Sequence, residues 1–534
     1  MKKQSFLQGA AILTATVALV KILGAVYKIP LGNMLGDEGF AHFSVAYSIY
    51  SLLLTISTAG LPVALSRLVA RADALGDKPL VRRTFNSARA AFLVLGGVST
   101  AVMLIFAPQL ANLMEDPEAR YAIFALAPSI VMVCLMSAYR GYSQGISNMT
   151  PTSVSQIIET VGKLLFGLAL AWFLISRGYG LPLASGGAIA GVTLGAAFAL
   201  IFIVLKVKLP RKSTVQITSN TVEHRKSQLI ELFKIGIPIT IGASVLSILA
   251  LADAKLILGR LQDAGGYSYA QAKTLYGVFS KVQTLFNIPS SFIVPLTVSV
   301  IPAIAARLAN NNRDGAASVT GTALKITTLL ALPAGVGLSV LATPIVNVIY
   351  PGSHSEGAGL LAILGVASFF TCVTLVTNAI LQAYGKERVP VYTMICGGIL
   401  KISSTYFLTP ILGIRGAAIG TIASFALISI LNICVLVFKT GYKLNGSAVK
   451  LLFSSAVMGA AAWFVYYAVI RTVNRQLIAL GAAIIVAVVI YAVLVVMLKV
   501  ITKDDLAFAP KGDKIAKLLR LRYLFRKNGQ KKWL

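Results

Sequence analysis

The chain has 534 residues, of which 57% belong to the hydrophobic set and only 12% are charged, and its mean hydropathy is +0.81. Soluble domains carry about 25% charged residues, so this composition excludes a soluble multidomain enzyme. A helix needs about 20 consecutive apolar residues to cross a bilayer, and the length leaves room for many such helices. The sequence therefore predicts an all-α, polytopic membrane protein.

The chain is strongly basic, with 48 Lys and Arg residues against 18 Asp and Glu residues and a formal net charge of +30. In a soluble protein this excess would indicate nucleic-acid binding. In a membrane protein it is typical of the positive-inside rule, by which cytoplasmic loops are enriched in Lys and Arg. We therefore expect no nucleic-acid partner.

Apolar segments recur along the whole chain and predict about fourteen membrane-spanning helices. They lie at 8–31, 41–66, 86–107, 120–143, 154–176, 183–205, 231–258, 275–304, 318–349, 357–384, 390–410, 413–438, 449–470 and 477–498. The first run has no clean small-residue cleavage site, so we expect a retained span rather than a signal peptide. With a cytoplasmic N-terminus, most Lys and Arg residues fall in inward loops, which predicts that both termini are cytoplasmic.

The first twelve spans contain a weak internal repeat. The segment LPVALSRL at 61–68 resembles IPAIAARL at 301–308, and GAIAG at 187–191 resembles GAAIG at 416–420. Six spans per repeat give both halves the same topology, as in many secondary transporters. The predicted regions are an N-lobe at 1–206, a cytoplasmic linker at 207–230, a C-lobe at 231–440, two extra helices within 441–500 and a basic cytoplasmic tail at 501–534. In the tail, apolar and basic residues are interleaved, which favours contact with anionic lipids.

Among the charged residues inside the predicted spans, six lysines and two acids are the candidates for a site at membrane depth, where a charge costs about 2.5–3.5 kcal/mol unless it faces a cavity or a partner. They are Lys21, Lys28, Lys163, Lys255, Lys281, Lys401, Glu159 and Asp253. Glu159 is one helical turn from Lys163, and Asp253 is close to Lys255, so mutual neutralisation is the simplest interpretation of both pairs. Lys21 and Lys281 have no acid within a turn. They favour a positively charged aqueous cavity.

A positive cavity suits an anionic substrate such as a phosphate or pyrophosphate. Lys21 and Lys28 are two helical turns apart and therefore share one face of the first helix. Arg67 and Arg71 share a face at the inner end of the second. For Lys28 the alternative is snorkelling to the interface, and for the two arginines it is anchoring at the cytoplasmic boundary.

Catalytic motifs are absent from the sequence. There is no HExxH, GxSxG or Walker A motif, and the histidines at positions 42, 224 and 354 make no metal-ligand spacing. We therefore predict no catalytic residue, no metal site and no cofactor. The expected class is a transporter rather than an enzyme. An integral-membrane glycosyltransferase, the alternative from another class, requires paired carboxylates that the sequence does not offer.

Several segments carry a family resemblance. They are GAVYKIPLG at 24–32, LGDE at 35–38, AGLPVALSR at 59–67, RGYSQG at 140–145 and QAYG at 382–385. Together they resemble the SpoVB/MurJ branch of the multidrug/oligosaccharidyl-lipid/polysaccharide (MOP) exporter superfamily, over about residues 1–500. The resemblance implies a flippase for lipid-linked cell-wall precursors, foremost undecaprenyl-pyrophosphate-linked lipid II. It also implies alternating access between two six-helix lobes in a bacterial plasma membrane.

The resemblance further implies roles for individual residues. Basic residues on the first, second and eighth helices of MurJ-type proteins serve the substrate's pyrophosphate, which points here to Lys21, Lys28, Arg67 and Lys281. We add Lys255, another lysine at membrane depth. Asp37 and Glu38 lie where the family has an acidic outer gate residue. The family commonly has arginine where this chain has lysine, so a bidentate grip is not expected.

The implied partners are the undecaprenyl-linked substrate, membrane lipids and cell-wall synthases. The closest alternative is an exporter of another lipid-linked oligosaccharide, such as a teichoic, capsular or spore polysaccharide precursor. A cation-coupled drug antiporter of the same superfamily is more distant, because it requires acidic residues in the cavity and usually has twelve spans. A membrane scaffold would leave Lys21 and Lys281 without a purpose.

Overall fold

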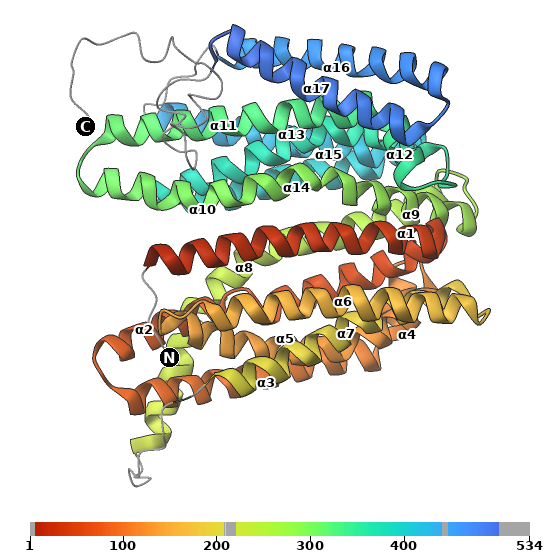
Figure 1. The fold of residues 1–534 in the computed structure, drawn as a ribbon. Coiled ribbons are helices and arrows are strands. Elements are labelled where there is room, and N and C mark those ends of the chain that lie inside the picture. Colours follow the sequence, from red (N-terminus) through yellow and green to blue (C-terminus); the bar gives the residue numbers. More distant parts are fainter. Residues whose placement is uncertain (1–5, 208, 210–219, 441–446, 501–534) are drawn as a thin grey trace, which may run out of the picture. The chain divides into compact units, whose positions relative to one another are not determined.

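The computed structural model describes residues 6–207, 209, 220–440 and 447–500, and the regular secondary structure of these residues is entirely helical (Figure 1). The all-α prediction is therefore confirmed. Residues 208 and 210–219 of the predicted linker at 207–230 and all of the predicted tail at 501–534 lie outside the described residues.

The chain divides into two compact units. The first unit comprises Met1–Ser291, Tyr350–Gly357 and Met394–Gly420, and the second comprises Phe292–Ile349, Ala358–Thr393 and Thr421–Leu534. These boundaries differ from the predicted division into two six-helix lobes, so the lobes stay a prediction.

The helices up to residue 286 belong to the first unit. They are α1 (Phe6–Thr58), α2 (Leu61–Ala74), α3 (Lys78–Ile105), α4 (Ala107–Leu113), the 3-10 helix η1 (Pro117–Ala119), α5 (Arg120–Gly145), α6 (Thr150–Ser176), α7 (Leu181–Lys206), α8 (Asn220–Asp263) and α9 (Tyr269–Phe286). The helices that follow are α10 (Ile288–Ala309), α11 (Arg313–Val340), α12 (Ala342–Ile349), α13 (Glu356–Ala383), α14 (Arg388–Leu412), α15 (Ile414–Thr440), α16 (Ser447–Val473) and α17 (Gln476–Met497).

Thirteen helical stretches among the described residues are long and apolar enough to cross a membrane, so the protein is a multi-pass membrane protein. Fourteen were predicted, and the difference lies at the start of the chain. The first two predicted spans fall within one continuous helical stretch, Ile12–Ala74. The predicted eighth span is also divided: α9 ends at Phe286, and α10 begins after Asn287 with Pro289 in its first turn, a position where proline is tolerated.

Inside α1, Gly36 interrupts the helical conformation, with φ +67° and ψ −170°. This region of backbone space is essentially restricted to glycine, because a Cβ atom would clash with the backbone. No neighbouring group would meet a Cβ at this position, so the requirement for glycine is conformational rather than a matter of space. Gly36 therefore sets the direction of the chain between the two halves of α1.

Glycines also bring helices of the first unit into close contact. A Cβ at Gly191 of α7 would overlap the backbone of Gly167 on α6, and a Cβ at Gly195 would meet the backbone of Glu159 and Lys163. Small residues at four-residue spacing allow such approach between membrane helices. This packing fixes the stretch of α6 that carries two of the interior charges.

The second unit is held by apolar clusters and by buried polar contacts. Ile304, Val319, Val376 and Leu436 are buried in one of its clusters. The side-chain amide nitrogen of Asn432 donates to Asn378 at 2.8 Å and to Thr377 at 3.0 Å, and the Tyr491 hydroxyl donates to the carbonyl oxygen of Leu329 at 2.8 Å. The two extra helices α16 and α17 pack together around buried Ala462, Leu480 and Ala483, which lie in another cluster.

Replacement of Gly36 by alanine tests the conformational role of this residue. We expect Gly36→Ala to destabilise the protein by about 1–3 kcal/mol, the cost of holding a side chain in a glycine-only conformation. The measurement is the thermal unfolding midpoint of the purified protein in detergent. Gly24→Ala is the matched control, because Gly24 lies in regular helix on α1 and its Cβ would also meet nothing within 4 Å. Equal midpoints for the two variants would contradict the assignment.

Candidate functional site

Two lysines of the first unit lie over the same aromatic ring. The Lys28 Nζ lies 5.5 Å from the ring centroid of Tyr47, and the Lys163 Nζ lies 5.3 Å from it. The Lys163 Nζ also lies 5.0 Å from the ring centroid of Tyr27. Ring faces attract ammonium groups, so the tyrosines hold the two cations close together without neutralising them.

Lys21 adds a third positive charge to this region. It precedes Lys28 by two turns on α1, is exposed, and makes no hydrogen bond or ion pair with any other residue that the structure describes. Electrostatic repulsion acts on Lys28 from both Lys163 and Lys21. We call Lys21, Lys28 and Lys163 the lysine cluster.

Buried aromatic packing fixes the positions of the two rings. Tyr27 is fully buried, and its hydroxyl donates to the carbonyl oxygen of Ala188 on α7 at 3.0 Å. Tyr47 is stacked against Phe43, with ring centroids 5.8 Å apart, and lies beside Tyr50 at 5.6 Å. The rings beneath the lysines are therefore held by α1 itself and by α7.

Glu159 makes no direct ion pair with Lys163, although its charge still acts on that lysine. Glu159 instead accepts a hydrogen bond at 2.9 Å from Arg140 on α5, which also donates to Ser155 at 2.9 Å. The planar Arg140 guanidinium can bind Glu159 and Ser155 at the same time. The Lys163 ammonium, one turn from Glu159 on the same helix, does not offer this geometry. Lys163 keeps no carboxylate partner among the described residues. Lys163 was not among the predicted substrate-binding residues, because the sequence pairs it with Glu159.

The predicted pairing of Asp253 with Lys255 is wrong. Buried Asp253 contacts the Lys401 Nζ at 2.9 Å and accepts a hydrogen bond from Thr405 at 3.1 Å, so a lysine far along the chain neutralises it. Lys255 is exposed on α8, and Arg67 is exposed on α2. No hydrogen bond, ion pair or ring contact between described residues joins either of them to the lysine cluster.

Lys281 is not the unpaired cation that the sequence indicates. Its Nζ donates to the Asp37 Oδ1 at 2.7 Å, and only 4% of its side chain is exposed. The same oxygen of Asp37 accepts from the Ser353 hydroxyl at 2.8 Å, and Oδ2 accepts from the backbone N–H of His354 at 2.9 Å. A predicted substrate ligand and a predicted gate residue therefore bind each other.

A close helix crossing makes this ion pair possible. A Cβ at Gly277 of α9 would overlap the carbonyl oxygen of Asp37, so only glycine allows the two backbones to approach. Gly32, one turn after Lys28, also allows a close approach: a Cβ at this position would press against the side chains of Lys281 and Tyr350. The crossing brings together residues that are far apart in sequence, and no local pattern could predict it.

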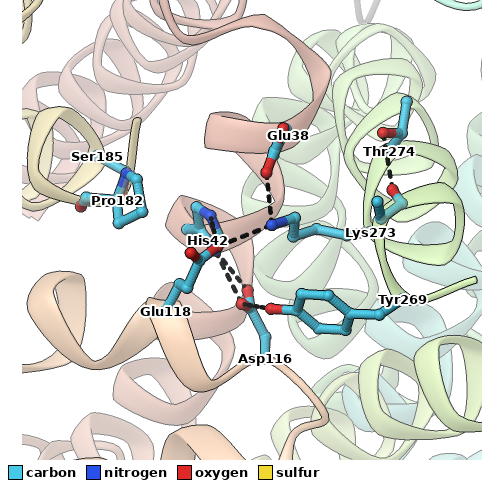
Figure 2. Close-up of polar contacts among 10 residues, drawn as sticks. Glu38, His42, Asp116, Glu118, Pro182, Ser185, Tyr269, Lys273 and Thr274 are labelled. Carbon is cyan, nitrogen blue, oxygen red and sulfur yellow. Dashed lines mark hydrogen bonds and ion pairs between the residues drawn. The ribbon is translucent and has the colours of Figure 1, made fainter. Parts of the chain in front are cut away.

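Glu38 takes part in a second set of contacts, nearer the start of α9 (Figure 2). The Lys273 Nζ contacts Glu38 at 2.5 Å and Glu118 at 2.8 Å. The His42 Nδ1 lies 2.8 Å from both carboxylate oxygens of Asp116, and the Tyr269 hydroxyl donates to Asp116 at 3.0 Å. We call this group the outer network; its members are Glu38, His42, Asp116, Glu118, Tyr269 and Lys273.

The electrostatics of the outer network keep its donors protonated. Burial lowers the pKa of Lys273, but the hydrogen bonds to Glu118 and Glu38 outweigh burial and raise it overall. Burial and the adjacent charge of Asp116 both raise the pKa of Tyr269. The ligand atoms of Glu38, His42 and Glu118 lie within 4.8 Å of one another, a grouping that the spacing of the histidines in the sequence does not indicate.

A cleft of about 650 Å³ lies near the start of α9, with Tyr267, Thr274 and the ion-paired side chains of Glu356 and Arg415 in its lining. It contains no residue of the lysine cluster and none of the predicted lysines or gate acids. It is therefore not the site indicated by the sequence.

Comparison with known proteins gives the family. The model of the polysaccharide biosynthesis protein family matches residues 6–307, and the MatE model matches residues 273–407. The chain therefore belongs to the polysaccharide biosynthesis protein family, within the MOP superfamily, as the resemblance predicted.

Relatives in Bacillus subtilis cover nearly the whole chain. The uncharacterized membrane protein YabM is 27% identical over 98% of both chains, and stage V sporulation protein B is 26% identical over 96% of this chain and 98% of its own. The lipid II flippase MurJ is 26% identical over 90% of this chain and 92% of its own.

Solved structures share the fold. An inward-facing MATE family multidrug transporter has a TM-score of 0.67 at 17% identity and covers 79% of this chain and 98% of its own. The lipid II flippase MurJ in an inward closed conformation has a TM-score of 0.65 at 17% identity and covers 91% of this chain and 98% of its own. The predicted transporter fold is confirmed.

A double-mutant cycle tests the buried ion pair. Asp37→Asn leaves the Lys281 ammonium buried without an anion, whereas Lys281→Met leaves Asp37 with its hydroxyl and N–H donors. We therefore expect Asp37→Asn to lower the unfolding midpoint more than Lys281→Met, and the double variant to lose less than the sum, with a coupling of about 0.5–3 kcal/mol. Glu38→Gln is the comparison, because Lys273 keeps Glu118 and the loss should be smaller. Additive losses at Asp37 and Lys281 would show that the contact contributes nothing.

Proposed function

We propose that the protein is a flippase that moves an undecaprenyl-pyrophosphate-linked cell-wall precursor, foremost lipid II, from the inner to the outer leaflet. The observation that carries the proposal is the lysine cluster. Lys28 and Lys163 have aromatic rings but no carboxylate partner among the described residues. Cations at membrane depth are expensive unless they serve a site, and adjacent ammonium groups provide a complementary charge for a pyrophosphate.

The relatives support the chemical class of this substrate. Two of them carry names that connect them to lipid II flipping and to sporulation, and the family itself is named for polysaccharide biosynthesis. An inside-negative potential favours the outward movement of an anion by about 2.3 kcal/mol per charge per 100 mV. The proposed direction therefore needs no chemical step, and the protein acts as a transporter rather than an enzyme.

The proposed mechanism is alternating access, with the contacts between α1 and α9 as the outer gate. Asp37–Lys281 and Glu38–Lys273 join these two helices. For the headgroup to leave on the outer side, both ion pairs separate. Lys281, once separated from Asp37, then binds the pyrophosphate of the substrate in its place.

The remaining assignments follow from the family and the charge distribution. Arg67 and Lys255 are exposed, and in the proposal they attract the anionic headgroup rather than enclose it. We place the protein in a bacterial plasma membrane with both termini cytoplasmic, beside membrane lipids and the synthases that consume the precursor. The two extra helices, α16 and α17, serve the polyprenyl tail.

Export of another lipid-linked oligosaccharide is the second candidate. The sporulation relative matches this chain as well as the flippase MurJ does, and a pyrophosphate linkage would be bound by the same lysines. Export of a cationic drug, supported by the MatE match and the MATE fold, requires acids where this chain has the lysine cluster. The charge of the cluster favours an anionic substrate.

Alanine substitution of the lysine cluster tests the proposal. We expect Lys21→Ala and Lys28→Ala each to abolish flipping of lipid II in proteoliposomes, and Lys163→Ala to slow it at least about tenfold, the effect of losing about 1.4 kcal/mol of headgroup binding. All three variants should insert normally. Lys78→Ala is the control, because Lys78 is exposed at the start of α3.

Complementation of a bacterial strain that lacks its own lipid II flippase identifies the substrate. Rescue by the unchanged chain, lost in Lys28→Ala, supports lipid II. Normal expression without rescue would instead indicate another lipid-linked precursor. Unaltered transport in all three lysine variants would refute the role of the cluster.

A further inference from the structure

His42 in the outer network carries a buried nitrogen without a hydrogen-bond partner. The side chain is fully buried, and its Nδ1 lies 2.8 Å from both oxygens of Asp116. A carboxylate only accepts hydrogen bonds, so Nδ1 carries a proton, and in the neutral imidazole the lone pair of Nε2 is then free. Nε2 lies 3.3 Å from the Glu118 Oε2 but makes no hydrogen bond with any described residue. With a neutral ring, two acceptors therefore face each other.

We propose that Glu38, His42 and Glu118 form a binding site for a divalent transition-metal ion such as Zn²⁺. Their ligand atoms all lie within 4.8 Å of one another. The 3.3 Å between Nε2 and Oε2 matches the spacing of about 3.4 Å between two ligands of a tetrahedral zinc ion with bonds of about 2.1 Å. A cation between the two acceptors removes the repulsion that the lone pair of Nε2 otherwise meets.

The surroundings of His42 are those of a metal-binding histidine. Such histidines usually donate their second ring N–H to a carboxylate, which fixes the ring and strengthens the free nitrogen as a ligand. Here the carboxylate that accepts this N–H is Asp116, which is fully buried. Asp116 also accepts a hydrogen bond from the Tyr269 hydroxyl. The metal would therefore take its ligands from α1 and η1, and the segment before η1 and α9 would hold His42 in place.

Charge and exposure also favour a dication. The outer network contains three carboxylates and one ammonium, so with a neutral imidazole two negative charges are left over. The Glu38 and Glu118 side chains are 44% and 46% exposed, which gives an ion a path from solvent and leaves coordination positions for water. An imidazole with two carboxylates suits Zn²⁺ better than Mg²⁺ or Ca²⁺, which favour oxygen ligands alone.

Lys273 competes with the proposed ion. Its Nζ contacts the two carboxylates that would bind the metal, 2.5 Å from Glu38 and 2.8 Å from Glu118. Metal binding therefore weakens the contacts of Lys273 on α9 with Glu38 on α1 and Glu118 on η1. At the same time it links α1 to η1 through shared coordination of the ion. By thermodynamic linkage, removal of the Lys273 ammonium must strengthen metal binding by the same free energy by which that ammonium weakens it.

Zn²⁺ titration by calorimetry tests the site in the full chain, purified in detergent without a histidine tag. The background variant is His224→Gln/His354→Gln, in which His42 is the only remaining imidazole. We expect one saturable Zn²⁺ site per chain, and no comparable heat with Mg²⁺. Added His42→Gln or Glu118→Gln should weaken Zn²⁺ binding at least about a hundredfold, Asp116→Asn about 10–100-fold, and Lys273→Met should tighten it at least about tenfold.

Glu115→Gln is the matched control, since Glu115 is exposed in the same segment and belongs to no metal-ligand group among the described residues. It should leave Zn²⁺ affinity unchanged. If His42→Gln does not fold, half-exposed Glu118 decides the question. Absence of a saturable site in the background variant, or equal affinity in Glu118→Gln and Glu115→Gln, would overturn the proposal. Neither result bears on lipid transport, which is measured separately.

Discussion

A charge inside the hydrocarbon region of a membrane requires a counter-charge, a polarisable surface or water, and this constraint sorts the interior lysines of the protein. Lys281 and Lys401 each contact a carboxylate, at 2.7 and 2.9 Å. Lys28 and Lys163 lie over tyrosine faces instead. A ring face stabilises an ammonium without cancelling its charge, so the second pair keeps more of a field that attracts an anion than the first pair does.

Much of the fold could be predicted because the signals for membrane helices are local. Length and hydropathy identify a span within about 20 residues, and each of the fourteen predicted spans is largely helical, although some of them run across a break between two helices. The break at Gly36 is less accessible, because a glycine inside an apolar run is common and only the backbone conformation shows that this one ends the helical geometry.

The site was predicted less well, because its partners are not local. Glu159 and Lys163 have the spacing of an ion pair, yet Arg140 offers the better geometry for Glu159 from another helix. Asp37 and Lys281 are 244 residues apart, and His42 and Asp116 are 74 apart. Such contacts depend on which helices cross, and a single sequence does not encode that in any short motif.

In the proposed mechanism, the order of features along α1 connects recognition to gating. Lys21 and Lys28 precede Gly36, and Asp37, Glu38 and His42 follow it directly. Because the glycine-only conformation lies between them, a change in its two backbone dihedrals reorients the gate acids relative to the lysines without bending a regular helix. Separation of Asp37 from Lys281 breaks a buried pair and therefore carries a substantial cost. In the proposed mechanism, an anionic headgroup that reaches Lys281 would offset that cost, so the substrate itself would favour the opening of the gate through which it leaves.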